Sequence, residues 1–397
     1  MMNFLTKLCI PAGTDPKSHT GRVRCGTMCG IVGIILNCLL SAAKLSAGLL
    51  CGSIAMVADA VNNLTDAASS IVTLIGFRLS ARKADREHPF GHGRIEYLCG
   101  MAVSLLIILS GAELAQQSVI RIMNPAGTIF STAACTVAAC SILVKYFMMR
   151  FYNHFAVLTD SSALQSAAVD SRCDCIATLA VLSSMLVHQL TGLNPDGICG
   201  LAVAVFIIVS GLMSLSKTVT PLLGAEPDPA QAAQIEALVT GTDGVLGMHD
   251  LVIHDYGCGH GMITLHAEMD AADSLTEAHA LADHLERTIE ERFGLQTVIH
   301  IDPADLTNPL IRTLRTDLTR FLTALDPGIR FHDLQAVSEA DGSVHVSFDL
   351  ALPFGCALSD ETVLRAVSAH LTCIDASIRP LIRIDHYDPE LISSAVS

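Results

Sequence analysis

Two short segments, about a hundred residues apart, each place paired oxygen ligands inside an apolar stretch of the chain. The first, Asn62 to Asp66, lies within the apolar run 52–77, and the second, Asp170 to Asp174, begins another such run. Residues four apart share a helix face, so each pair can direct two side chains to one point. Carboxylates at membrane depth are energetically costly and normally mark an ion pathway. The spacing therefore predicts that four oxygen ligands from two helices enclose one divalent cation.

The first segment offers a second pair with the same spacing. Asp59 and Asn63 are also four residues apart, and Asp59 lies one helical turn before Asn62. Periodicity alone does not choose between this pair and Asn62 with Asp66. A purely structural role is the alternative, in which such polar side chains form hydrogen bonds to neighbouring helices or cap a helix end. That role explains a single polar residue more readily than it explains four together.

The composition indicates an integral membrane protein, because 51% of the residues are hydrophobic and the mean hydropathy is +0.50. Lysine and arginine gather before the first apolar stretch and between the second and third, which places both termini in the cytoplasm. Six stretches are long enough to cross a bilayer, at 28–50, 54–79, 97–120, 130–151, 161–187 and 195–216.

The chain changes character after Leu223, where a cluster of Gly and Pro residues at 224–229 ends the last apolar stretch. The remainder is acidic and of mixed hydrophobicity, and it reads as a cytoplasmic α+β region. The pattern predicts helices over 229–240 and 275–292 and strands over 249–256, 262–268 and 297–301.

This pattern occurs twice, at a shift of 83 residues that aligns 249–251 with 332–334 and 298–302 with 381–385 without a gap. We infer a tandem duplication. The histidines are mostly not repeated, because His266 aligns with Asp349, His279 with Thr362 and His300 with Arg383. We therefore expect the second copy to keep the fold and to lose any metal site of the first. The expected organisation is an N-terminal segment 1–27, a membrane domain 28–223, an α+β domain 228–305 and a degenerate repeat 306–390.

Two sequence motifs resemble those of the cation diffusion facilitator family, and the set of one Asn and three Asp resembles that of its manganese-exporting members. They are the segments Ser53–Asp66 and His88–Glu96, and the resemblance covers about residues 27–302. It implies a homodimeric exporter that exchanges a cytosolic divalent metal for protons and carries a ferredoxin-like cytoplasmic domain. The second repeat, 308–388, lies outside the usual plan of the family.

The resemblance also assigns site residues. It places the transport site at Asn62, Asp66, Asp170 and Asp174. It implies a loop metal site at Asp85, His88 and His92, although these residues could instead shape a loop against the membrane surface. It implies a regulatory cytoplasmic cluster at His249, His266, His279, His300 and Asp302.

The ligand types bear on which metal is transported. Zinc favours imidazole and thiolate, whereas one Asn and three Asp offer only hard oxygen, which suits Mn²⁺, Mg²⁺ or Ca²⁺. Mn²⁺ is therefore the first expectation and Fe²⁺ the second, with Zn²⁺ retained as the family default. Buried carboxylates that lose their cation take up protons, so proton exchange follows from the same groups.

We expect a secondary transporter and not an enzyme, since the HExxH and GxSxG motifs are both absent from the sequence. A non-transporting metal sensor or sorting scaffold is the alternative, because the doubled cytoplasmic part exceeds what a carrier needs. The expected partners are divalent metal ions, protons, the lipid bilayer of the cell (inner) membrane and a second copy of the chain, with no nucleic acid. No cofactor is expected beyond the metal itself, as substrate and as regulator.

Overall fold

The computed structural model describes residues 6, 16–51, 54–124, 132–191, 195–224, 227–257, 260–340 and 342–387. The chain forms two compact units. The helical unit comprises Met1–Ala225 with Asp255–His260, and the α/β unit comprises Glu226–His254 with Gly261–Ser397.

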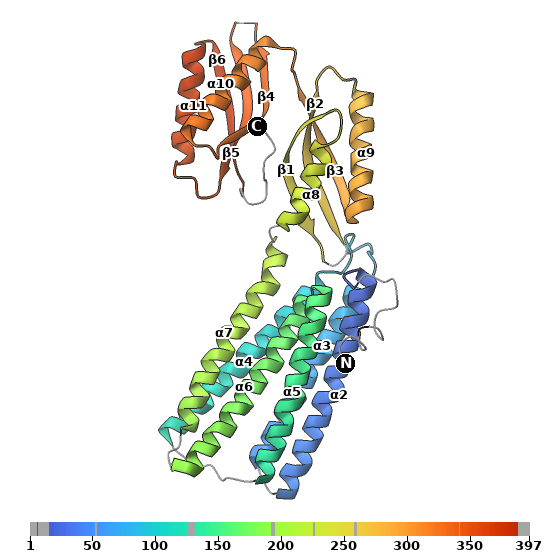
Figure 1. Cartoon of the computed structure of the whole chain (residues 1–397), viewed down its shortest axis with the longest axis vertical. Coiled ribbons are helices and arrows are strands. Elements are labelled where there is room, and N and C mark those ends of the chain that lie inside the picture. The colour runs from blue at the N-terminus through green and yellow to red at the C-terminus, as the bar shows by residue number, and fades with distance from the viewer. Residues whose placement is uncertain are drawn as a thin grey trace. The chain divides into compact units, whose positions relative to one another are not determined.

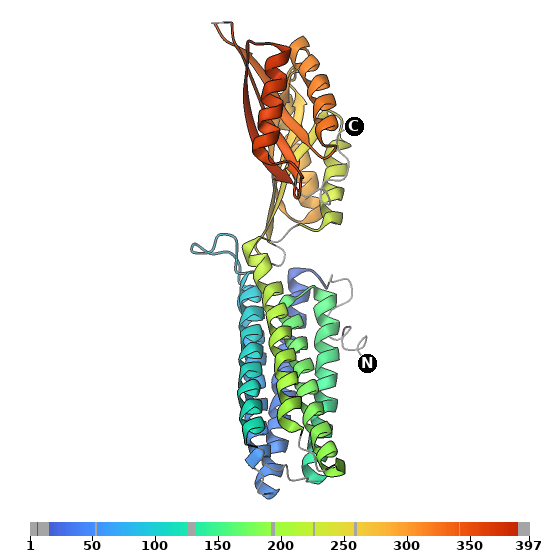
Figure 2. The ribbon, with the colours of Figure 1, turned by 90° about the vertical axis from the view of Figure 1, so that its left-hand side faces the viewer.

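Long helices that run side by side build the helical unit (Figures 1 and 2). They are α2 (His19–Cys51), α3 (Ile54–Ser80), α4 (Ile95–Met123), α5 (Thr132–Thr159), α6 (Ser162–Thr191) and α7 (Asp196–Leu223). Each predicted apolar stretch falls on one of them, except that positions 161 and 195 lie one residue before α6 and α7. Positions 130 and 131 lie outside the described residues. Their outer surface exposes large apolar side chains such as Leu39, Leu143 and Leu190, which suits contact with lipid.

Five of these helices are long and apolar enough to cross a membrane within the described residues, namely α2, α4, α5, α6 and α7. Helix α3 does not reach that hydropathy. The reason is its chemistry, because it carries Asp59, Asn62, Asn63 and Asp66 among its apolar residues. The polar residues that interrupt α3 thus include the ones that the sequence assigned to the transport site.

The first helix begins earlier than the sequence indicated. α2 starts at His19, within the segment 1–27 that was expected to be an N-terminal tail. A buried ion pair explains why these polar first turns pack, since Arg22 donates to Glu96 of α4 at 3.0 Å and Ser161 donates to the same oxygen at 2.6 Å. Pairing of this kind is what a charge removed from water requires.

The tip of a hairpin, Asp255–His260, packs within the helical unit against the loop that precedes α4. Arg94 donates to the backbone carbonyl of Asp255 at 2.6 Å, and Tyr256 stacks on Phe90 with ring centroids 4.3 Å apart. Gly257 has φ +99°, and a Cβ there would lie 2.2 Å from the carbonyl carbon of Gly93. Only glycine fits so close an approach.

The α/β unit contains two halves with the same order of elements. The first half is α8 (Pro229–Thr240), β1 (Val245–Asp255), β2 (Gly261–Asp270), α9 (Leu275–Phe293) and β3 (Gln296–Ala304). The second is α10 (Pro309–Leu325), β4 (Arg330–Ser338), β5 (Val344–Pro353), α11 (Asp360–Ile374) and β6 (Ile378–Tyr387). Their sheets have the orders β1-β2-β3 and β4-β5-β6, and in each the second and third strands are parallel.

Local sequence signals set these elements. Asp228 and Asn308 cap α8 and α10, while Ser274 forms a capping box with Glu277 at the start of α9. Alternate residues of β2 and β5 are buried, so each sheet packs one face on its own apolar core. The predicted helices and strands of the first half lie within the observed ones, except that the strand predicted over 249–256 ends one residue beyond β1. Positions 388–390 of the expected second repeat lie outside the described residues.

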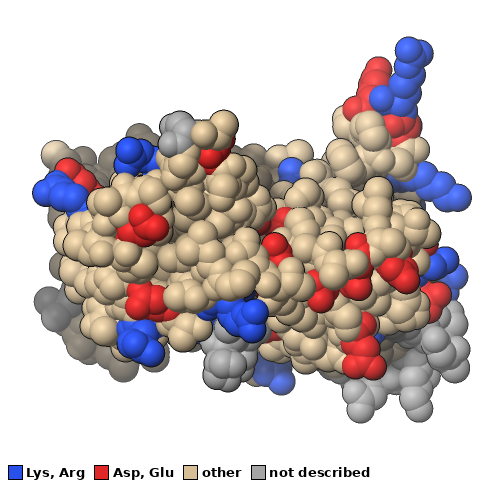
Figure 3. All heavy atoms as spheres, turned by 90° about the horizontal axis from the view of Figure 1, so that it is seen from above, with Lys and Arg blue, Asp and Glu red and all other residues tan. Residues whose placement is uncertain are grey.

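A backbone irregularity recurs in the two halves. Asp250 has φ +51° and Asp333, 83 residues later, has φ +53°, a left-handed conformation that Asp tolerates better than most residues. On the face shown in Figure 3, acidic and basic side chains are interspersed, and the basic ones form no continuous patch among the residues described.

Candidate metal sites

Three carboxylates converge between two helices of the helical unit. Ligand oxygens of Asp66 on α3 and of Asp170 and Asp174 on α6 all lie within 4.8 Å of one another. Asp66 is only 8% exposed. The structure thus brings together three of the four residues that the sequence assigned to the transport site, and their oxygens suit a hard divalent cation.

The fourth predicted ligand, Asn62, is exposed and does not lie with them in this structure. The buried amide belongs to Asn63, which is 2% exposed. With the amide oriented by its partners, its nitrogen donates to Asp66 at 3.3 Å and its oxygen accepts from Lys44 at 2.8 Å. A spacing of three residues aligns Asn63 with Asp66 as well as a spacing of four aligns Asn62, and the helix is turned to bury the former.

Asp59, the other residue of the alternative pair, lies outside the carboxylate cluster. Its carboxylate is 2.8 Å from the ammonium of Lys44, and its side chain is 49% exposed. Lys44 itself is buried and therefore links Asp59 to Asn63. The alternative pair is thus split, with Asn63 beside the cluster and Asp59 held by a lysine.

The sequence reasoning missed Lys145 of α5, whose ammonium lies inside the cluster. Its Nζ is 2.7 Å from Asp66 Oδ2 and 2.6 Å from Asp174 Oδ2, and its side chain is 3% exposed. A lone lysine within an apolar helix is the signal that could have identified it, because such residues normally face a polar interior or a partner. Three carboxylates and one ammonium leave a net charge of −2, which one divalent cation balances.

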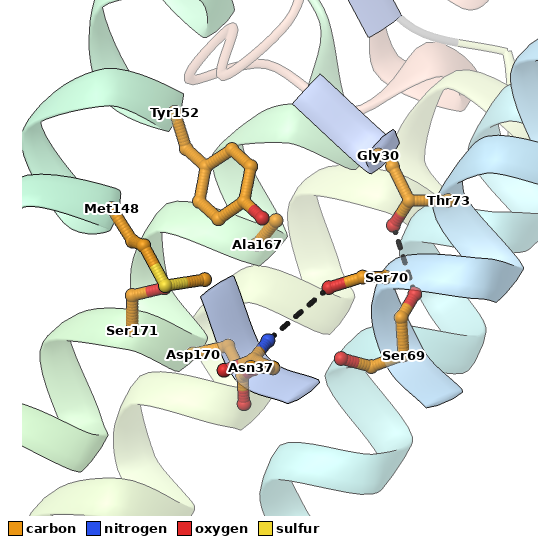
Figure 4. Close-up of a pocket in the computed structure, with 10 residues that line it drawn as sticks. All are labelled: Gly30, Asn37, Ser69, Ser70, Thr73, Met148, Tyr152, Ala167, Asp170 and Ser171. Atoms are coloured by element: carbon orange, nitrogen blue, oxygen red, sulfur yellow. Dashed lines mark hydrogen bonds between the residues drawn. The ribbon is translucent and has the colours of Figure 1, made fainter. Parts of the chain in front are cut away.

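A small cavity with several polar groups in its lining adjoins the cluster on the side of Asp170 (Figure 4). Its volume is about 10 Å³, close to what a single water molecule needs. Hydroxyl and amide groups of α2, α3 and α5 line it, including Asn37, Ser70 and Tyr152, and Asn37 donates to Ser70 at 3.4 Å. The carboxylate of Asp170 therefore faces groups that can hold water or a proton.

The predicted loop residues also lie together. Nitrogen atoms of His88 and His92 are 3.3 and 3.5 Å from the two carboxylate oxygens of Asp85, and the two rings are 4.5 Å apart. Asp85 Oδ1 also accepts the backbone N–H groups of His88 and Glu87, and the His88 backbone bond is the main cause of a lowered pKa of Asp85. The carboxylate thus shapes the turn, and the geometry fits both the metal and the structural interpretation of this loop.

A third cluster lies on the sheet of the first half. Asp302 Oδ2 is 3.1 Å from His249 Nε2 and 2.8 Å from His266 Nδ1, and Asp302 Oδ1 is 3.3 Å from His300 Nε2. The register of the sheet explains part of this arrangement, since His266 on β2 pairs with His300 on β3. His279 does not take part: it is exposed on α9 and belongs to no metal-binding group among the described residues. The role of His279 in this cluster stays a prediction.

Electrostatics in this cluster favour a charged His249. Burial acts to lower its pKa, but hydrogen bonds and charges from Asp250 and Asp302 outweigh burial and raise the pKa to about 9. Burial acts to raise the pKa of Asp302, and the hydrogen bonds from His249 and His266 more than offset it, so that this pKa is lowered. An imidazolium between two carboxylates is the arrangement expected where a cation is to be exchanged for protons.

Comparison with known proteins is informative for both units. The cation efflux transmembrane domain matches residues 30–223, and the cytoplasmic domain of cation efflux proteins matches residues 227–304. The cation-efflux pump FieF of Salmonella typhi is 29% identical over 256 residues, which is 64% of this chain and 85% of the pump. An uncharacterized transporter of Methanocaldococcus jannaschii is 26% identical over 276 residues, 69% of this chain and 97% of that protein.

The two matches together cover more than half of the chain and contain the carboxylate cluster, the loop residues and the histidine cluster of the first half. The chain is therefore a member of the cation efflux, or cation diffusion facilitator, family of integral membrane proteins that transport metal cations.

Proposed function

We propose that this protein exports a divalent metal cation, Mn²⁺ in the first instance, from the cytoplasm in exchange for protons. The observation that carries the proposal is the convergence of Asp66, Asp170 and Asp174 between two helices of a membrane bundle. Membrane-depth carboxylates that face one another repel unless a cation lies between them. A divalent cation can fill that role, and Lys145 fills it in part when no metal is bound.

The choice of metal rests on the donor set. The three carboxylates offer only oxygen within the described cluster, and hard oxygen ligands suit Mn²⁺ better than they suit Zn²⁺. Fe²⁺ is the second choice. Zn²⁺ binds many oxygen sites more tightly than Mn²⁺ does, so selectivity has to be measured and does not follow from affinity order alone.

The proton half of the exchange rests on charge. Without metal, the cluster keeps a net charge of −2 in a surrounding of low dielectric, and bound protons are the simplest way to remove it. The cavity beside Asp170 supplies hydroxyl groups and room for about one water molecule, which is what a proton needs to reach a buried carboxylate.

We further infer that the protein functions as a homodimer in the cell (inner) membrane, with both termini in the cytoplasm. A regulatory metal site in the cytoplasmic part would be formed by His249, His266, His300 and Asp302. A further metal site would be formed by the loop residues Asp85, His88 and His92. The equal order of elements in the two halves and the left-handed Asp at equivalent positions support a tandem duplication. The doubled α/β unit is also what favours the alternative function, a metal sensor or sorting scaffold without transport.

Purified protein in proteoliposomes tests the proposal, with uptake of Mn²⁺, Fe²⁺, Zn²⁺ and Co²⁺ measured in parallel under a proton gradient. Mn²⁺ flux should be the fastest, and either Asp66→Ala or Asp174→Ala should abolish it while the protein still elutes as a folded dimer. Asp59→Ala is the matched control, because Asp59 lies on the same helix outside the cluster, and it should retain most of the flux. Wild-type flux in the Asp66 or Asp174 variant would refute the site, and no flux of any metal would favour the sensor.

A further inference from the structure

His332, on β4 of the second half, lies against the metal cluster of the first half. Its ring stacks on that of His249, with centroids 3.9 Å apart and planes inclined by 24°. Its Nε2 is 3.8 Å from a carboxylate oxygen of Asp250. The second half therefore places an imidazole beside the histidine cluster on the sheet of the first half.

In its own half, His332 is not accompanied by the other imidazoles of the first-half cluster. It occupies the position equivalent to His249, but the positions equivalent to His266 and His300 hold Asp349 and Arg383. Asp349 pairs with Arg383 across the parallel strands, so a fixed cation stands where the first half has an imidazole. Among the described residues, the metal-binding group that includes His332 takes its other two ligands, His249 and Asp250, from the first half.

Ligand atoms of His249, Asp250 and His332 lie within 4.8 Å of one another. His332 is buried, with 10% of its side chain exposed, His249 is mostly buried, at 12%, and Asp250 is exposed. His332 Nδ1 is buried without a hydrogen-bond partner among the described groups. A buried ring nitrogen without a partner is uncommon and is not what packing alone would select.

We propose that His249, Asp250 and His332 form a second divalent-metal site, which bridges the two halves of the α/β unit. Two imidazoles and a carboxylate suit Zn²⁺, Co²⁺ or Fe²⁺ better than Mn²⁺. A metal bound there joins β1 to β4 and so ties the second half to the first. The site stands on the geometry of the α/β unit and does not depend on which metal the helical unit transports.

The two clusters of the α/β unit share His249, and this sharing makes them alternatives. His249 Nε2 faces Asp302, whereas His249 Nδ1 lies 3.5 Å from Asp250. A neutral imidazole has only one nitrogen with a free lone pair, so His249 binds one metal at a time. The metal either stays within the first half, with His266 and Asp302, or bridges the halves, with Asp250 and His332.

The test measures Co²⁺ binding to the full-length protein in detergent, by equilibrium dialysis and by the visible absorption of the bound ion. All variants carry Asp174→Ala, which removes the transport site, so the result is independent of whether the protein transports. His266→Ala is added to disable the position within the first half. His332→Phe then removes the ligand but keeps the ring that stacks on His249, and His345→Phe, on the neighbouring strand β5, is the matched control.

With His266→Ala in place, His332→Phe should remove one equivalent of Co²⁺ per chain and its absorption band, while His345→Phe should leave both unchanged. His332→Phe or His266→Ala alone should each retain that equivalent, because the other position remains. Equal binding with and without His332 in the His266→Ala background, in variants with unchanged melting temperature, would overturn the bridging site. Loss of an equivalent in each single variant would show that two metals bind at once and would overturn the sharing of His249.

Discussion

The ammonium of Lys145 lies 2.7 Å from a carboxylate oxygen of Asp66, in the middle of the proposed transport site. It reaches Asp174 at 2.6 Å as well, so α5 supplies a cation at the point where α3 and α6 meet. The ammonium occupies the Oδ2 atoms of both carboxylates, which a metal ion in the cluster could otherwise bind. Lys145 therefore competes with the metal and also limits the charge of the empty site.

Replacing this lysine separates the two effects. Lys145→Met should bind Mn²⁺ at least about tenfold more tightly and release it more slowly, because a unit charge about 4 Å away contributes several kcal/mol at an effective dielectric constant of 20. Lys145→Arg keeps the charge and should remain close to the wild type in affinity. Titration with Mn²⁺ and the rate of flux in proteoliposomes measure both quantities.

Lys44→Met is the control for that experiment, as Lys44 is also buried in the bundle but pairs with Asp59 and not with the three converging carboxylates. Its effect on Mn²⁺ affinity should be several times smaller. If Lys145→Met binds Mn²⁺ no more tightly than the wild type does, competition between the ammonium and the metal is not a property of this site.

The two asparagines of α3 should respond differently to truncation. Asn63→Ala should weaken Mn²⁺ binding by about tenfold or more, because it removes a buried amide that contacts Asp66, and a hydrogen bond to a charged group contributes about 1.5–3 kcal/mol. Asn62→Ala should stay within about twofold of the wild type, since Asn62 is exposed. The reverse order in a Mn²⁺ titration would mean that α3 turns to present Asn62 when the metal binds.

Asp170→His should shift selectivity toward zinc. The change replaces a hard carboxylate in the cluster with an imidazole, which Zn²⁺ binds well and Mn²⁺ less well. Parallel flux of the two metals in proteoliposomes gives the ratio, with Asp170→Asn as a control that removes the charge without adding an imidazole. A wild-type protein that already prefers Zn²⁺ would refute the assignment of manganese.

The raised pKa of His249 predicts a pH-dependent stability of the metal-free protein. The pKa is raised from an ordinary value of 6.5 to about 9 in the folded state. Protonated His249 therefore contributes fully to the free energy of unfolding below pH 6.5, and this contribution is lost as the pH rises toward 9. Thermal unfolding in the presence of a chelator should therefore show a lower melting temperature at pH 9 than at pH 6.5. His249→Gln should reduce this difference, and an unchanged pH profile in that variant would exclude His249 as its source.

Much of the architecture could be predicted from the sequence, because hydrophobic stretches and strand alternation record it locally. The phase of α3 could not, since Asn62 and Asn63 both align with Asp66 at helical spacing and only packing decides which one is buried. Lys145 was missed because it stands alone on a helix with no motif around it. The repeat aligns His332 with His249, but no spacing in the sequence reveals that the two rings meet between the two halves.

The charge inside the carboxylate cluster has an electrical consequence. With Lys145 retained, the three carboxylates and one divalent ion sum to zero, so the loaded site carries no charge for the transmembrane voltage to act on. The same sum without the ion is −2, and the voltage then acts on the empty site unless two protons neutralise it. The position of one lysine thereby sets which half of a transport cycle the membrane potential can drive.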